Sequence, residues 1–93
     1  MKYNYILREV YMPKKHFKKD RIAELSEKEN VIFSLLWINK KRFRSWNELS
    51  KVLYGEETNK QTRGKISWII HRMRKKGISI KSLYKKGFVL REE

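Results

Sequence analysis

Residues 58–77 read TNKQTRGKISWIIHRMRKKG, and this stretch decides the fold that the sequence predicts. Its apolar residues recur at helical spacing, so one side of a helix can be buried while the other stays in water. The residues expected on the buried side are Ile66, Ile69, Ile70 and Met73. Thr58 and Gln61 have the spacing of a capping box, and Gly77 suits the position just past a helix end. We therefore expect a helix over about residues 59–76 with a basic exposed side.

Two further helices are expected before this one. Ser26 and Glu29 have capping-box spacing and open an apolar helical pattern that lasts to about residue 39. Ser45 and Glu48 repeat the spacing ahead of a shorter helix that stops at Gly55. The residues expected to face the core are Val31, Ile32, Leu35, Leu36 and Ile38 in the first helix and Trp46, Leu49, Val52 and Leu53 in the second.

Strand-like patterns lie at both ends of the chain. Residues 2–12 are rich in Tyr, Ile and Val and stop at Pro13, which predicts a strand or a bent strand, and residues 21–25 are expected to return beside it. The alternative for this region is a flexible basic arm lying along DNA. Residues 78–90 alternate apolar and polar side chains around a basic tip at residues 84–87, which predicts a hairpin.

Composition points to an anionic partner. The chain has 93 residues, enough for one domain, and 40% of them are hydrophobic. Its formal net charge is +14, which favours nucleic acid first and an anionic membrane surface second. No apolar run approaches the roughly 18 residues that a membrane span needs, so we expect no membrane partner. The N-terminus lacks the apolar core of a secretory signal, so the expected location is cytoplasmic.

The order of three helices followed by a hairpin with a basic tip is that of a winged helix-turn-helix, an α+β fold. The expected single domain, residues 1–93, divides into an N-terminal β segment or basic arm (1–25), a three-helix core (26–77) and a wing (78–91). In this fold the third helix enters the major groove of duplex DNA and the wing lies on the neighbouring backbone or in the minor groove.

Residues 25–90 also resemble the DNA-binding domain of OmpR/PhoB-type response regulators. LSEKENVIFSLL (25–36) is similar to the family's entry into its first helix, IIHRMRKK (69–76) to the end of its recognition helix, and ISIKSLYKKGFVL (78–90) to its wing. The resemblance implies a transcriptional regulator that binds double-stranded DNA. Too few residues precede Leu25 for a receiver domain, so no aspartyl-phosphate switch is expected. The chain departs from the family pattern at Gly64 and Lys65 in the helix and at Tyr84 and Lys85 in the wing.

The basic helix carries the predicted DNA contacts. No acidic residue occurs between positions 58 and 91, whereas a helix built only for solubility interleaves acids with its lysines. The candidates for reading base edges are Arg63, Ser67, His71 and Arg72. The candidates for phosphate contacts are Lys60, Lys65, Arg74, Lys75, Lys76, Lys85 and Lys86.

Aromatic side chains leave alternatives open. Trp46 is expected in the core, and Trp68 on the flank of the basic helix, where it packs under the wing or reaches the DNA backbone. Tyr84, at the wing tip, is expected either to contact a sugar or the minor groove or to lie over neighbouring lysine stems. A single recognition helix covers few base pairs, so a homodimer or tandem binding is the ordinary route to specificity.

The second hypothesis is a protein-interaction module that binds transcription machinery and has only general DNA affinity. The resemblance implies a loop that contacts RNA polymerase, here with Glu56 and Glu57, and the aromatic N-terminal segment is the other feature that favours this hypothesis. RNA binding through the basic residues 14–19 ranks third. The sequence holds no cysteine, no cluster of metal ligands and no catalytic motif, so we expect no enzyme, metal or cofactor. A small, very basic, lysine-rich regulator would suit a phage, a virus or a mobile element.

Overall fold

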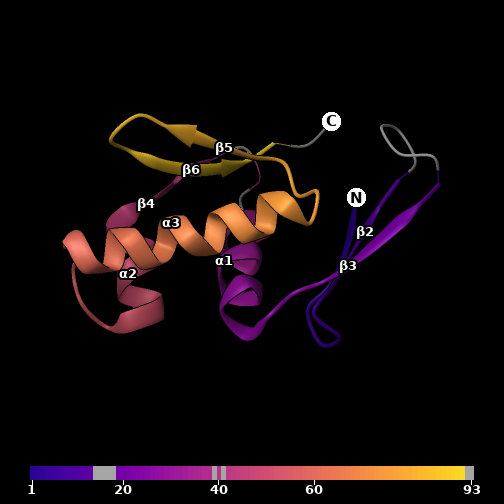
Figure 1. The fold of residues 1–93 in the computed structure, drawn as a ribbon, viewed down its shortest axis with the longest axis horizontal. Coiled ribbons are helices and arrows are strands. Elements are labelled where there is room, and N and C mark those ends of the chain that lie inside the picture. Colours follow the sequence, from indigo (N-terminus) through magenta and orange to yellow (C-terminus); the bar gives the residue numbers. More distant parts are fainter. Residues whose placement is uncertain (14–18, 39, 41, 92–93) are drawn as a thin grey trace.

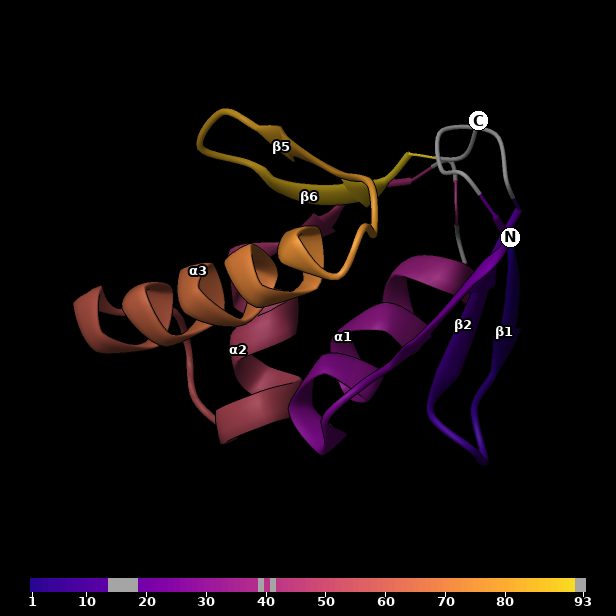
Figure 2. The same cartoon turned by 45° about the vertical axis from the view of Figure 1, so that its right-hand side comes forward.

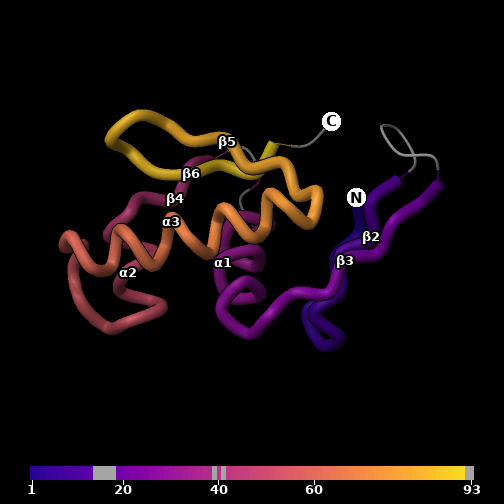
Figure 3. The backbone as a smooth tube through the Cα atoms, in the orientation of Figure 1, coloured from indigo at the N-terminus to yellow at the C-terminus, as the bar shows by residue number. Residues whose placement is uncertain are grey.

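Strands occupy both ends of the chain and helices the middle. The computed structural model describes residues 1–13, 19–38, 40 and 42–91. The elements are, in order, β1 (Lys2–Asn4), β2 (Glu9–Met12), β3 (Arg21–Glu24), α1 (Glu27–Ile38), β4 (Arg44–Ser45), α2 (Trp46–Tyr54), α3 (Lys60–Lys75), β5 (Ile80–Leu83) and β6 (Gly87–Leu90). Figure 1 shows their arrangement, and Figure 3 traces the path of the backbone.

The N-terminal segment is a three-stranded antiparallel sheet in the order β1-β2-β3. The prediction of one strand over residues 2–12 is therefore wrong, because a turn at residues 5–8 folds that segment into a hairpin. Within this turn the Leu7 N–H donates to Asn4 Oδ1 at 3.2 Å, and Arg8 adopts a positive φ of 54°. An Asn side chain that accepts a nearby backbone hydrogen bond stabilises a turn of this kind. The predicted return strand is confirmed as β3.

This sheet is anchored to the helices. Val10, Met12 and Ala23 bury one face of it in the core, and the Tyr3 hydroxyl donates a hydrogen bond to Asn30 of α1. The alternative of a flexible arm is therefore wrong for the described part of the segment. Most of the basic loop at residues 14–19, including His16, lies outside the described residues.

The first helix follows the predicted capping box. The Glu29 N–H donates to Ser26 Oγ and the Ser26 N–H donates to Glu29 Oε1. Its buried side is Glu29, Ile32, Phe33 and Leu36, at i, i+3, i+4 and i+7. The predicted core position of Ile38 is wrong, because that side chain is 70% exposed at the last helical residue.

The second helix is capped at both ends as predicted. Ser45 Oγ accepts from the Glu48 N–H at 3.1 Å, and Gly55 adopts the left-handed conformation after the last turn. Leu49 is fully buried. The predicted burial of Val52 is wrong, since it lies off the side defined by Trp46, Leu49 and Leu53 and is half exposed.

The C-terminal hairpin is confirmed, but its sheet has a third strand that the sequence did not predict. β6 pairs with both β5 and β4, so the connector between α1 and α2 joins the wing. Gly87 permits this pairing, because a Cβ added there would lie 2.0 Å from the Arg44 carbonyl oxygen. Trp46 then packs edge-on against Phe88 at a ring-centroid distance of 4.8 Å, as expected of a core aromatic.

The arrangement leaves one long helix at the surface. α3 packs across α1 and α2, and the β5–β6 hairpin, called the wing below, lies along one side of it (Figure 1). Turned by 45°, the molecule shows the N-terminal sheet beside α1, away from the wing tip (Figure 2). The side of α3 that faces away from α1 and α2 is therefore open to a partner.

Candidate nucleic-acid interface

α3 begins one residue later than its predicted capping box. Asn59 is the N-cap: its Oδ1 accepts from the Thr62 N–H at 3.0 Å, and Thr62 Oγ1 accepts from the Asn59 N–H at 2.8 Å. The prediction of Thr58 and Gln61 is wrong because the Thr58 N–H is used elsewhere, donating to Asn47 Oδ1 of α2 at 2.9 Å. This bond ties the start of α3 to α2.

The buried side of α3 is as predicted. Ile66, Ile69, Ile70 and Met73 are at most 6% exposed, and Thr62 joins them at the first turn. A helix with one side held this firmly presents a fixed set of side chains on its opposite side.

The four base-reading candidates are all exposed on α3, but they do not share one side. Arg63 and Arg72 are nine residues apart, which at 3.6 residues per turn places them about 180° apart around the helix. Ser67 lies on the wing side, where it lines a hollow between α3 and the wing. His71 lies on the outer side, with its ring 6.0 Å from that of Trp68.

Arg74 joins α3 to the wing. Its Nε and one terminal nitrogen donate to the Ile80 carbonyl oxygen at 3.0 and 2.8 Å, and that same terminal nitrogen donates to Ser82 Oγ at 2.7 Å. Hydrogen bonds from a charged donor are among the stronger ones in proteins. This guanidinium therefore holds the wing in position beside the helix.

Lys76 is engaged inside the protein. Its Nζ lies 2.5 Å from Glu29 Oε1 and donates to the Glu24 carbonyl oxygen at 2.7 Å. Burial by itself raises the pKa of Glu29, but hydrogen bonds from Lys76 and Ser26 outweigh burial and hold this pKa below its ordinary value. Glu29 is fully buried, so Lys76 supplies the counter-charge that this carboxylate needs.

The other phosphate candidates are exposed cations on two elements. They are Lys60, Lys65 and Lys75 on α3 and Lys85 and Lys86 at the wing tip. Lys65 extends over the ring of Tyr54, with its Nζ 5.0 Å from the ring centroid. Tyr84 is 85% exposed at the wing tip, and the Nζ of Lys85 lies 5.4 Å from its ring centroid. Both alternatives for Tyr84 therefore stay compatible with its position.

Trp68 does not pack under the wing. It is 62% exposed on the outer side of α3. Beside it lies a shallow hollow lined by Lys60, Gln61, Gly64, Lys65 and Trp68. Sequence reasoning left both Gly64 and Gln61 out of the predicted contacts. The four-residue spacing of Lys60, Gly64 and Trp68 puts these residues on one side of a helix, and this spacing in the sequence could have predicted the hollow.

The predicted polymerase-contact loop forms the support of α3. Glu56 and Glu57 are both exposed. The Glu56 carbonyl oxygen accepts from Ser50 Oγ at 2.7 Å, and its side chain accepts from Asn59 Nδ2 at 3.2 Å. Glu56 thus braces the N-cap of the basic helix.

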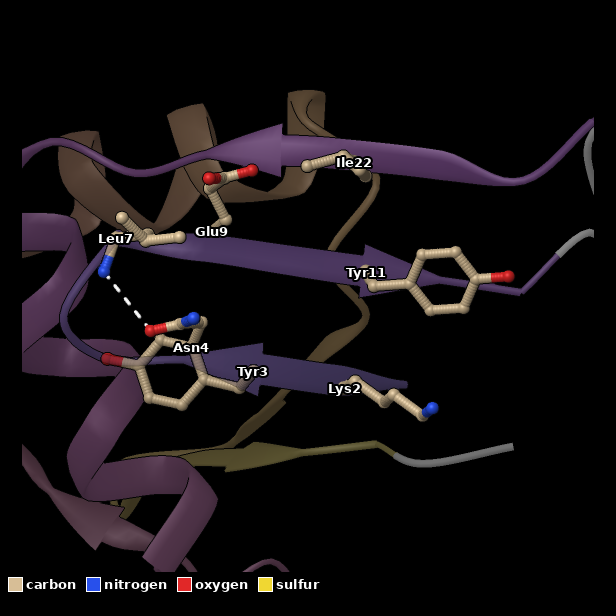
Figure 4. A pocket seen from close by; sticks show the side chains of 7 residues that line it. All are labelled: Lys2, Tyr3, Asn4, Leu7, Glu9, Tyr11 and Ile22. Carbon is tan, nitrogen blue, oxygen red and sulfur yellow. Dashed lines mark hydrogen bonds between the residues drawn. The ribbon is translucent and has the colours of Figure 1, made fainter.

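A third hollow lies on the outer face of the N-terminal sheet. Figure 4 shows its lining residues: Lys2, Tyr3, Asn4, Leu7, Glu9, Tyr11 and Ile22. Two of its lining residues are exposed apolar side chains, Ile22 at 62% and Leu7 at 59%. The Tyr11 hydroxyl donates to the Asp20 carboxylate, and this hydrogen bond raises the pKa of Tyr11.

Within the described ranges, no group of three or more His, Cys, Asp or Glu side chains is placed to hold a metal ion. In the same ranges, no helix is long and apolar enough to cross a bilayer.

Comparison with known proteins identifies the fold. No protein-family model and no curated protein match the sequence. Among solved structures, the chain is similar to the crystal structure of the response regulator AdeR DNA-binding domain in complex with an intercistronic region. The similarity has a TM-score of 0.69, covers 98% of this chain and 93% of that chain, and comes with 16% sequence identity. The chain therefore has the α+β winged-helix fold of a response-regulator DNA-binding domain, as the sequence resemblance implied.

Proposed function

We propose that this chain binds double-stranded DNA in a sequence-specific manner and acts as a transcriptional regulator. The observation that carries the proposal is the outer side of α3, which bears exposed cations, has no acidic residue, and belongs to a fold that in AdeR binds DNA. α3 enters the major groove, which is wide enough for a helix, and the wing lies on the adjacent backbone or in the minor groove. No enzymatic step is part of this function.

The proposed contacts divide into two sets. Base edges are read by Arg63, Ser67, His71 and Arg72, with the two arginines reaching base pairs on opposite sides of the helix. Phosphates are neutralised by Lys60, Lys65, Lys75, Lys85 and Lys86, which supply most of the affinity. We assign Arg74 and Lys76 a positioning role in place of a phosphate contact, because the donors of Arg74 already bind the wing and the ammonium of Lys76 already binds α1.

A test of this function compares three nucleic acids. Fluorescence anisotropy is measured with a randomised duplex, a single-stranded DNA and an RNA hairpin, and the bound duplex pool is enriched by repeated selection. We expect preference for the duplex and the emergence of a sequence motif. Equal binding to all three without a motif would reject the proposal in favour of a protein-interaction module.

Alanine variants test which side chains read the base edges. Arg63→Ala and Arg72→Ala are expected to weaken binding to the selected site by about 5- to 150-fold each, the range of a good bidentate contact to guanine. Lys2→Ala, which removes an equal charge from the N-terminal sheet, serves as the control. If all three variants lose affinity equally, the arginines act only through charge.

We further propose that two copies bind repeated half-sites, since one α3 covers few base pairs. The spacing of half-sites in the selected motif tests this: a single unrepeated site would exclude it.

Contact between the Glu56–Glu57 loop and RNA polymerase is the corresponding proposal for activation. It is tested by transcription in vitro with Glu56→Gln and Glu57→Gln variants that keep DNA affinity. The proposed place of action is the cytoplasm, on the nucleoid or in a host cell if the source is viral.

A further inference from the structure

Gly64 stands in the middle of α3 although the fold does not require a glycine there. Its φ is not in the left-handed region, and among the described residues nothing outside its own helix lies within 4 Å of a Cβ built at this position. Glycine inside a helix is less favourable than alanine, because its backbone loses more conformational freedom on folding. The position therefore gives up helix stability without any gain in packing.

Trp68 lies one turn after Gly64 on the same side of the helix. An indole that is 62% exposed presents a large apolar surface to water, on the side of α3 opposite the buried Ile66 and Ile70. Lys60, Gln61 and Lys65 complete the lining of the hollow beside Gly64 and Trp68. The outer side of α3 thus combines an apolar surface, a gap where the helix backbone is bare, and cations on either side.

This combination fits one feature of the major groove. The C5-methyl group of thymine is the apolar group that base edges display there, and it is recognised by apolar side chains. A glycine allows the close approach of a helix backbone to a ligand, which brings the neighbouring indole down to the base edges. Flanking ammonium groups favour the phosphates on both sides of the groove.

We propose that Gly64 and Trp68 form a thymine-methyl contact, in which the bare backbone at Gly64 lets α3 approach the groove floor and the indole of Trp68 packs on the methyl group. The inference rests on the proposed DNA binding and deepens it, since it assigns sequence preference to an apolar contact beside the polar ones. The contact explains why the Trp68 indole is exposed and why a glycine stands at position 64 although the fold does not require one.

The experiment pairs a change in the protein with a change in the DNA. In the duplex obtained by selection, each thymine is replaced in turn by deoxyuridine, which removes only the methyl group. Affinities are measured for the wild-type protein, Trp68→Ala, Trp68→Phe and Gly64→Ala. Ile22→Ala, an equally exposed apolar residue on the N-terminal sheet, is the matched control.

For the wild type we expect at least one replacement to lower affinity about fourfold, the effect of one methyl group removed from an apolar contact. The same replacement has no effect in Trp68→Ala and keeps its effect in Trp68→Phe and Ile22→Ala. Gly64→Ala is expected to remain folded, with unchanged or higher thermal stability, and to bind the selected site on the order of tenfold more weakly.

Two outcomes would overturn the inference while leaving the proposed function intact. One is selective DNA binding in which deoxyuridine has the same effect on the wild type and on Trp68→Ala at every position. The other is Gly64→Ala binding as tightly as the wild type. A failure to select any motif would instead reject the proposed function itself.

Discussion

Lys75 and Lys76 are neighbours in sequence with different surroundings. Lys75 is exposed on α3, whereas the ammonium of Lys76 is paired with the buried Glu29. A charge run in a sequence does not distinguish a cation that meets solvent from one that neutralises a buried acid. The distinction comes from which element lies opposite each side chain.

Lys76→Met is expected to lower the free energy of unfolding by about 3 kcal/mol, because it leaves the Glu29 carboxylate buried without a counter-charge. Lys75→Met is the matched control and should change stability by less than about 0.5 kcal/mol. Urea denaturation followed by tryptophan fluorescence measures both. Equal stability of the two variants would show that the pair contributes little to the fold.

The Glu29 carboxylate also predicts a pH dependence. Its pKa is lowered in the folded state, so its contribution is present above the unfolded pKa and is lost as the pH falls through the folded pKa. We expect the unfolding free energy of the wild type to decrease as the pH is lowered below about 4.5, the ordinary pKa of a glutamate. Glu29→Gln cannot take up this proton, so the difference in stability between the two proteins should shrink with falling pH. A constant difference between pH 7 and pH 3 would contradict the assignment.

At the scale of elements, the wing depends on residues that lie far from it in sequence. β4 supplies its third strand, and Arg74 of α3 binds two of its residues. The hairpin is recognisable from its alternating pattern, but its fixed orientation beside α3 comes from these contacts. The wing and α3 are therefore fixed to each other as one unit.

Gly87→Ala is expected to break the pairing of β4 with β6, since its Cβ would collide with the Arg44 backbone. We predict a loss of about 3 kcal/mol in unfolding free energy, as for overpacking of a close contact. Gly64→Ala is the contrasting control, expected to stabilise the protein by about 1 kcal/mol through helix propensity. Thermal unfolding measures both, and similar effects of the two changes would contradict the structure at β4.

For the molecule as a whole, charge is distributed unevenly along the fold. α3 and the wing carry no acidic residue, while Glu9, Glu24, Glu27 and Glu29 lie on the N-terminal sheet and at the start of α1. Such a distribution directs one side of the molecule toward a polyanion and leaves the N-terminal end less attractive to it.

Binding to the selected duplex is therefore expected to weaken steeply with salt. If the five exposed lysines of α3 and the wing tip each neutralise one phosphate, a plot of log affinity against log salt concentration has a slope of about −4.5. Lys75→Met should reduce the magnitude of this slope by about 1. A slope near zero for the wild type would exclude phosphate neutralisation as the source of affinity.

Much of the fold follows from local patterns in the sequence. The capping box at Ser26, the N-cap at Ser45, the stop at Gly55 and the buried side of α3 depend on residues within a turn or two of one another, and all of them are confirmed. The second half of the capping box predicted for Ser45 and Glu48 is not formed among the described residues, because the Glu48 carboxylate pairs with Arg44. The order of helices and hairpin then points to the winged helix. The lack of acidic residues between positions 58 and 91 likewise needs no structure to be seen, because charge is a property of composition.

Tertiary structure alone decided the features that join distant residues. The strand at Arg44–Ser45 exists because β6, far along the chain, pairs with it, and β3 adds the third strand to the hairpin within residues 2–12. Ile38 and Val52 lie in solvent because of how each helix is rotated against its neighbours. Each helix has more apolar residues than its buried side can hold, so the apolar pattern alone does not determine this rotation. The inward role of Lys76 and the outward position of Trp68 have the same cause: a side chain's role depends on what lies opposite it, and the packing of whole elements determines that.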